Sequence, residues 1–212
     1  MSLPQPLQYQ TNHVSRFSLI LSFFIFATLL QGCAISQQPS SFSYDFGSLP
    51  KVQKQLAVNM AISVADISAP STLDGNAMLY RLLYDNQQRL RPYAQHRWSM
   101  PPAQLLTQRL KSRIAAEGGT VLAEADGVAD LPVLKIDLDE FSQAFASVSQ
   151  SEAQITLRVS VIKKNKLIAQ HYFATRTVSD SADASGGAKA MQTTADASIN
   201  AILAWLQNLP LN

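Results

Sequence analysis

The chain has 212 residues, of which 47% are hydrophobic and 15% charged, and its formal net charge is +2. This length accommodates one domain with a substantial core plus additional segments. The small net charge argues against nucleic-acid binding, which usually needs a basic patch. The single cysteine, Cys33, excludes an internal disulfide.

The N-terminal region is dominated by an almost wholly apolar stretch without charge, FSLILSFFIFATLL at 17–30. As a helix it would be roughly 21 Å long, which is too short to span a hydrocarbon core about 30 Å thick. Arg16 stands directly before it and is the only Lys or Arg in the first 32 residues. This pattern is typical of a secretory signal peptide, which we predict over residues 1–32.

Leu30-Gln31-Gly32-Cys33 follows the apolar stretch and resembles a bacterial lipobox, in which a small residue precedes a cysteine that is lipidated and becomes the mature N-terminus. A single acyl chain binds a membrane only marginally, but a bacterial lipoprotein N-terminus carries more than one, so we expect a permanent anchor at Cys33. The alternative is a buried free cysteine after a signal anchor. Ala34, in place of an Asp, favours the outer membrane by analogy.

Residues 34–50 are rich in Ser, Gln and Pro, so 33–50 is predicted to be a lipidated N-terminus and flexible linker. Such a linker spans on the order of 20–25 Å and would hold a domain near the membrane without docking it there. The alternative is that Tyr44 and Phe46 pack on the domain, which is predicted over residues 51–212.

The first half of this domain is predicted to contain three strands and a helix. Alternating apolar residues indicate strands at 55–67, 77–85 and 92–98, with a polar turn at 86–91. Pro101-Pro102 suits the first turn of a helix. Its apolar stripe consists of Leu106, Leu110 and Ile114, and Gly118-Gly119 ends it. Residues 120–124 form a short strand at most.

The second half repeats the alternating pattern in three strands, at 131–141, 151–162 and 167–178. A loop ending at Gly186-Gly187 leads into a last helix, whose apolar face is Met191, Ala195, Ile199, Ile202 and Leu206. Hairpins dominate and only two helices are predicted. We therefore expect an α+β fold, with a mixed or antiparallel sheet of about five to six strands and both helices packed on one face.

Motifs for catalysis or metal binding are missing from the sequence. It contains no HExxH, CxxC, G-x-S-x-G or phosphate-binding glycine motif, and His96 and His171 lie singly on predicted strands. Asp137, Asp139 and Glu140 could act as an acid–base pair or bind a cation, but a solvated strand face explains them better. The same explanation applies to Asp180 and Asp183. We predict no catalytic residue, metal site or cofactor.

The segment 80–106 combines aromatic and arginine side chains, which are favoured at interface hot spots. The candidate partner contacts are Tyr80, Tyr84, Tyr93, Arg97, Trp98, Pro101 and Pro102. The alternative is that these side chains fill one edge of the core.

Tyr80, Tyr84, Tyr93, Arg97-Trp98 and Pro101-Pro102, followed by a Leu-rich helix, resemble the signature of the ABC-type transport auxiliary lipoprotein family, which includes PqiC-like proteins. The resemblance covers nearly all of residues 44–209, and a lipobox is expected in the family. Met100 departs from it, because a small residue often precedes the Pro-Pro pair.

The resemblance implies a non-catalytic subunit, lipid-anchored on the periplasmic face of the outer membrane. Its partners would be a periplasmic MCE-domain protein and the associated permease and ATPase, which together move lipids or other hydrophobic molecules between the two membranes and support envelope integrity. The domain itself could bind a lipid. Two other readings are an activator or assembly factor for another envelope machine, and a lipid-anchored hydrolase, which the missing nucleophile motifs disfavour.

Replacing the predicted lipidation site tests the N-terminal assignment. We expect Cys33→Ser to abolish labelling with a fatty acid and to release the domain into the soluble periplasm, because no thiol remains to take the anchor. Envelope fractionation measures the outcome. A variant that still sediments with membranes would show that the lipobox assignment is wrong.

Overall fold

The structure is a computed structural model that describes residues 40–50, 60–128 and 130–211. The predicted signal peptide, Cys33 and the first part of the predicted linker lie outside the described residues, as do residues 55–59 of a predicted strand. The described residues belong to one unit that begins at Ser40.

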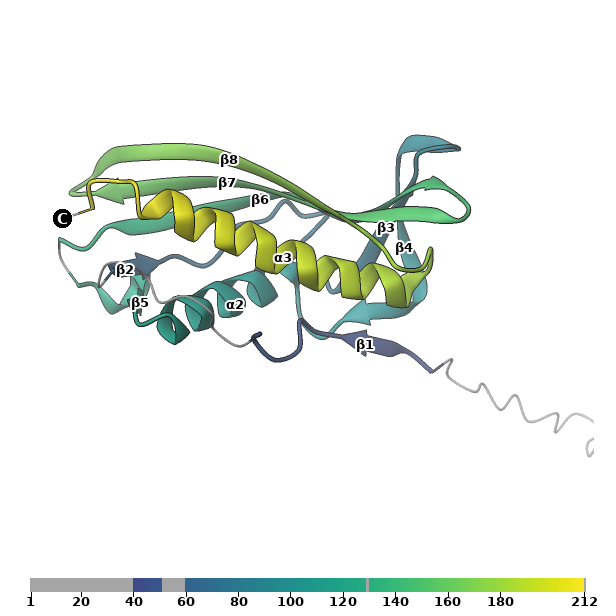
Figure 1. The fold of residues 1–212 in the computed structure, drawn as a ribbon, viewed down its shortest axis with the longest axis horizontal. Coiled ribbons are helices and arrows are strands. Elements are labelled where there is room, and N and C mark those ends of the chain that lie inside the picture. Colours follow the sequence, from purple (N-terminus) through teal and green to yellow (C-terminus); the bar gives the residue numbers. More distant parts are fainter. Residues whose placement is uncertain (1–39, 51–59, 129, 212) are drawn as a thin grey trace, which may run out of the picture. The chain divides into compact units, whose positions relative to one another are not determined.

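The described part of the chain contains one mixed sheet of eight strands (Figure 1). The strands are β1 (Phe42–Tyr44), β2 (Ala61–Val64), β3 (Ala77–Leu82), β4 (Asn86–Trp98), β5 (Thr120–Ala123), β6 (Val133–Ser147), β7 (Gln150–Lys163) and β8 (Lys166–Val178). The long strand β6 organises the sheet. One edge pairs with β7 along almost its whole length, while the other edge pairs with β2 near its start and with β3 near its end.

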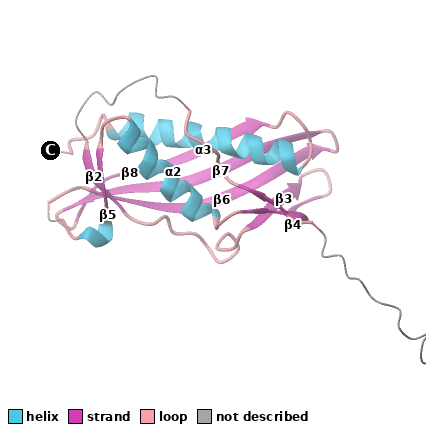
Figure 2. Ribbon diagram, turned by 90° about the horizontal axis from the view of Figure 1, so that it is seen from below, coloured by secondary structure: helices cyan, strands magenta, loops and turns pink. Residues whose placement is uncertain are grey.

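Two helices, α2 (Pro102–Ala116) and α3 (Ala184–Leu206), lie on the same side of β6, β7 and β8 (Figures 1 and 2). A short 3₁₀ turn, η1 (Glu124–Asp126), follows β5. The predicted α+β class and the placement of both helices are therefore confirmed. The strand count exceeds the expected five to six, because the prediction did not include β1 and treated residues 120–124, which form β5, as a short strand at most.

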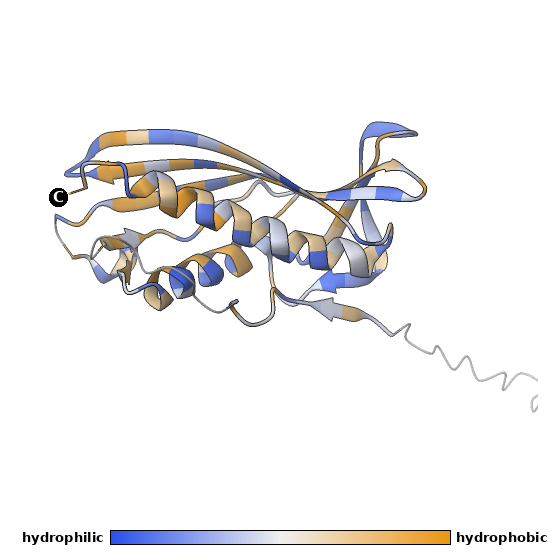
Figure 3. Cartoon of the chain, in the orientation of Figure 1, coloured by the Kyte–Doolittle hydropathy of each residue, from blue (hydrophilic) through white to orange (hydrophobic). Residues whose placement is uncertain are grey.

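The core lies between the helices and the inner face of the sheet. Alternate residues of β7, from Ala153 to Val161, are buried there, as are the predicted apolar residues of α2 and α3. Figure 3 shows that the half of α3 nearest the C-terminus is more hydrophobic than its first half. Burying this apolar surface supplies the main stabilisation of the fold, at about 25 cal/mol per Å².

Two predicted boundaries differ from the structure in the first half of the domain. Residues 86–91 belong to β4 rather than to a turn, and the chain reverses at 83–85 instead. Because this part of β4 is an exposed polar strand, its residues lack the apolar alternation that would have marked it. The strand predicted at 55–67 is β2, which is limited to Ala61–Val64 among the described residues.

The predicted linker also contributes to the domain. Tyr44 and its neighbours form β1, which pairs in parallel with His96–Trp98 of β4, and Phe46 is 3% exposed. Tyr44 and Phe46 therefore pack on the domain, which is the alternative that the sequence left open. A three-residue strand is too short to produce a periodic signal within a Ser- and Gln-rich segment.

The last helix begins before the two glycines rather than after them. Asp183 is its N-cap, and its carboxylate accepts a hydrogen bond of 2.7 Å from the backbone N–H of Gly186. A Cβ on Gly186 would lie 2.3 Å from the Ser181 carbonyl oxygen, and one on Gly187 would lie 2.0 Å from Oε1 of Gln143. These glycines permit close packing in the first turn and do not break the helix.

The Asp183 cap makes stability depend on pH. Its hydrogen bonds with the helix N-terminus hold the pKa of the carboxyl below its ordinary value, so the stabilisation is present above the unfolded-state pKa of about 3.9 and is lost as the pH falls through the folded-state pKa. We expect Asp183→Ala to lower the free energy of unfolding by about 1 kcal/mol at neutral pH and to converge with the parent in acid.

Urea unfolding at neutral and acidic pH measures this difference. Asp180→Ala is the matched control, since Asp180 lies in the same loop but only forms an exposed ion pair with Lys189, which contributes little. Equal losses for the two variants would contradict the capping role.

Candidate functional site

An aromatic cluster joins β1 to the rest of the sheet. The His96 ring stacks with Phe42 at 5.0 Å and with Tyr44 at 5.8 Å between ring centroids, and Nδ1 of His96 lies 3.0 Å from the Tyr44 hydroxyl oxygen. Trp98 is 1% exposed and packs edge-on against Phe46 and Phe141. Stacked and edge-on aromatic pairs add about 0.5–1.5 kcal/mol each beyond simple burial, so this cluster fixes the start of the domain.

The structure does not bring the seven predicted contact residues onto one surface. Trp98 and Pro102 are buried, so they cannot meet a partner in the folded domain. Tyr80 and Tyr93 are half-buried and pack against each other, with ring centroids 4.6 Å apart and ring planes tilted by 42°, and Pro101 is the partly buried N-cap of α2. The two exposed members are Tyr84, in the β3–β4 turn, and Arg97, near the end of β4.

Tyr93 is part of a polar network centred on Gln143, which is fully buried. The Tyr93 hydroxyl donates to Oε1 of Gln143 at 2.9 Å, and Nε2 of Gln143 donates to Ser151 Oγ and to the Asp183 carbonyl. Burial, reinforced by nearby Tyr80 and Asp183, raises the pKa of Tyr93. Its hydroxyl therefore stays protonated and serves as a donor that links β4, β6, β7 and the start of α3.

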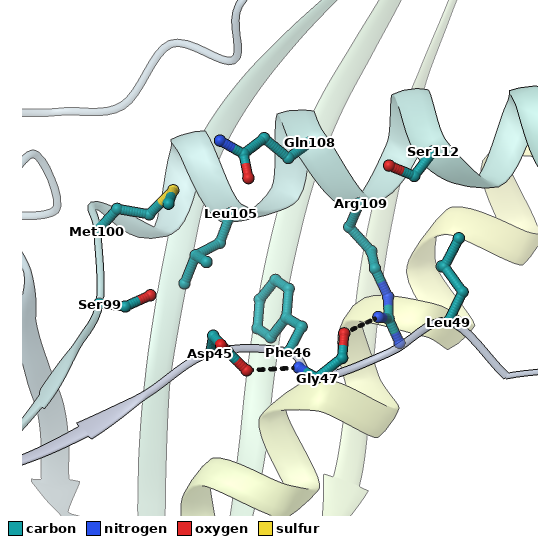
Figure 4. A pocket seen from close by; sticks show the side chains of 10 residues that line it. All are labelled: Asp45, Phe46, Gly47, Leu49, Ser99, Met100, Leu105, Gln108, Arg109 and Ser112. Carbon is teal, nitrogen blue, oxygen red and sulfur yellow. Dashed lines mark hydrogen bonds between the residues drawn. The ribbon is translucent and has the colours of Figure 1, made fainter.

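A cavity of about 330 Å³ lies between the segment after β1 and helix α2 (Figure 4). Arg109 of α2 reaches toward Gly47 on its far side, while Leu105 and Phe46 form apolar walls. The other lining residues are Asp45, Leu49, Ser99, Met100, Gln108 and Ser112. Among the contacts of the described residues, neither lining serine, Ser99 or Ser112, is hydrogen-bonded to a base, the arrangement that activates a serine nucleophile.

Arg109 binds three elements together and is only 5% exposed. Its Nε and Nη2 donate to the two carboxylate oxygens of Asp196 in α3, at 2.8 and 2.7 Å, and Nη1 donates to the Gly47 carbonyl at 2.9 Å. Bidentate arginine–carboxylate pairs are among the stronger polar contacts. The side chain therefore stabilises the position of residues 45–49, and these bonds use three of its five N–H donors.

The acidic candidates are engaged in ordinary surface contacts. Asp137 pairs with Arg158 and Glu140 with Arg81, each at 3.2 Å, and Asp139 is exposed. In the described residues, no three His, Cys, Asp or Glu side chains gather in a way that could hold a metal ion. Within the same ranges, neither helix is long and apolar enough to cross a bilayer.

The sequence reasoning missed Arg109, Asp196 and Gln143. One signal for Arg109 was available: it lies next to Leu110 and four residues after Leu105, on the buried side of α2. A charged residue on a buried stripe requires a partner. No local pattern marks Gln143, because two of its partners, Tyr93 and Asp183, are distant in the sequence.

The model of the ABC-type transport auxiliary lipoprotein component matches residues 44–202, most of the chain, and it begins within β1. This chain belongs to that family. Its fold is similar to the crystal structure of a protein from Xanthomonas campestris, with a TM-score of 0.62 at 18% identity over 79% of this chain and 92% of that one. No curated protein sequence matches the chain.

Two further solved structures share the fold. An uncharacterized protein has a TM-score of 0.60 at 16% identity, covering 79% of this chain and 99% of its own. A hypothetical protein from Chlamydia trachomatis has a TM-score of 0.51 at 8% identity, covering 71% and 96% respectively. At these identities the likeness concerns the fold alone, and the family assignment depends on the sequence match.

Removing the Arg109 guanidinium tests its clamping role. We expect Arg109→Ala to lower the free energy of unfolding by about 3 kcal/mol, because it leaves the Asp196 carboxylate without its partner. Amide hydrogen exchange at residues 42–49 should become faster. Lys111→Ala is the control on the same helix, since its pair with exposed Asp66 is worth at most about 1 kcal/mol. Equal urea midpoints for the two variants would contradict the account.

Proposed function

We propose that this auxiliary lipoprotein is anchored through acylated Cys33 in the outer membrane and works from its periplasmic face as a non-catalytic subunit of an MCE-type transport system. It would dock the periplasmic MCE-domain protein, whose permease and ATPase move lipids or other hydrophobic molecules between the membranes. Membership of the family carries the proposal, and the lipobox-like residues before Cys33 support it.

The chemistry of the domain supports a binding role. Three polar side chains, the buried Arg109 and Gln143 and the half-buried Tyr93, form hydrogen bonds between structural elements. Satisfied polar networks of this kind make a fold rigid. These contacts are what a rigid docking module requires.

Lipid would be handled mainly by the partner rather than inside this domain. The cavity in Figure 4 measures about 330 Å³, at the small end of the range for small-molecule pockets. Its lining includes the Arg109 side chain, which is hydrogen-bonded to the Gly47 carbonyl. Three other cavities measure about 370, 350 and 380 Å³. A lipid with two acyl chains would need a much longer apolar cavity, so we assign the domain a role in contact and positioning.

Affinity purification of the tagged chain from cross-linked envelopes tests this function. We expect an MCE-domain protein, a permease and an ATPase to be recovered together. The Cys33→Ser variant, prepared in parallel, should recover less of this set because the domain is no longer held at the membrane. Recovery of cell-wall synthases or another assembly machine alone would contradict the proposal and favour the activator or assembly-factor reading.

A further inference from the structure

One end of the domain concentrates exposed apolar side chains. This β1 end comprises the start of β1, the β3–β4 turn, the β6–β7 turn and the end of β8, which lie at the same end of the domain in Figure 1, with β1 and the β3–β4 turn on opposite sides of that end. Its large exposed hydrophobic residues are Phe42, Leu83, Tyr84, Val148 and Val178. Isolated exposed apolar residues are normal on protein surfaces, but a cluster of them indicates a contact site.

Three segments of the β1 end are fixed against one another. The Leu83 N–H donates to the Phe145 carbonyl and the Ser179 N–H to the Ser151 carbonyl, each at 2.9 Å. Leu83 and Val178 line the same cavity of about 350 Å³ as residues of the β6–β7 turn. The apolar side chains therefore form a preorganised surface.

Two arginines without an ion pair lie next to this surface. Among the described residues, neither Arg89 nor Arg97 of β4 forms an ion pair, and both are exposed. Of the nearby carboxylates, Asp85 binds Arg91, Glu152 binds Arg176 and Asp183 caps α3, whereas the exposed Asp45 after β1 accepts only the Gly47 N–H. Apolar and aromatic tips beside free arginines match the interface of a bilayer with anionic lipids.

The length of chain before β1 brings this end close to the membrane. Phe42 is nine residues after Cys33, and nine residues reach at most about 30 Å even when fully extended. The sequence predicts a linker that runs to residue 50, whereas in the structure β1 already begins at Phe42. An anchor on Cys33 therefore keeps β1 within one short tether of the bilayer surface.

We infer that the β1 end rests on the bilayer that holds the anchor, with its apolar tips at the level of the lipid headgroups and Arg89 and Arg97 against lipid phosphates. This inference assumes the acylation of Cys33 contained in the proposed function. It leaves the opposite end, at the β7–β8 turn and the C-terminus, facing the periplasm and available to a protein partner.

The two turns that flank β7 provide a matched test. β7 has 14 residues, so its ends are about 45 Å apart, and Val148 and Leu167 are exposed beside the first and second turn at 79% and 61%. Acylation consumes the only native thiol, so Val148→Cys and Leu167→Cys each provide a single labelling site. Both are labelled with a polarity-sensitive fluorophore in the acylated protein, reconstituted in vesicles of phosphatidylethanolamine and phosphatidylglycerol.

We expect the label at 148 to shift to shorter emission wavelength and to be quenched by spin-labelled lipids, and the label at 167 to behave as in water. Higher salt should weaken the quenching at 148, because it screens the arginine–phosphate contacts. The inference is overturned if the label at 148 has the same emission wavelength and the same lack of lipid quenching as the label at 167. It is also overturned if the emission of the label at 148 shifts only when the MCE-domain partner is added. Failure of the anchor itself is distinguishable, because two labels per chain would show that Cys33 is free.

Discussion

The pairing of β1 with β4 determines where the folded domain begins, and the rest of the account depends on that position. Three residues, Phe42–Tyr44, align with His96–Trp98, and aromatic stacking on both sides of His96 supports a strand that would be too short to persist alone. Phe46 then enters the core beside Trp98. Because the folded domain begins at Phe42, the chain that connects it to Cys33 is shorter than the predicted linker, which runs to residue 50.

Polar contacts inside the domain make this attachment rigid. Arg109 joins the segment after β1 to both helices, and Gln143 joins β4 to β6, β7 and the start of α3. Apart from the bond between Gln143 and Ser151, these contacts link elements that are distant in sequence, so loosening one would affect several elements. Hydrophobic burial stabilises the fold as a whole, whereas these bonds specify how its parts meet.

The sequence was informative where a segment is long and has one buried face. The apolar alternation of 151–162 and the stripe of Leu106, Leu110 and Ile114 were sufficient to predict β7 and α2. It was uninformative where tertiary contacts override local preference: β1 lies in a Ser-rich segment, the first half of β4 is polar, and Gly186-Gly187 pack against Ser181 and Gln143 instead of ending a loop. The sequence could not tell which candidate contacts lie on the surface, because aromatic residues occur in cores and in interfaces. Only their burial in the structure distinguishes Trp98, which is in the core, from Tyr84, which is exposed.

A lipoprotein held by a short tether differs from one held by a long linker in how far its domain can be from the bilayer. Neutron reflectometry of the acylated protein on a supported bilayer measures this most directly. The account predicts protein density that begins at the headgroups, with the β6–β8 sheet extending away from the membrane. A water-filled layer between the headgroups and the protein would contradict it.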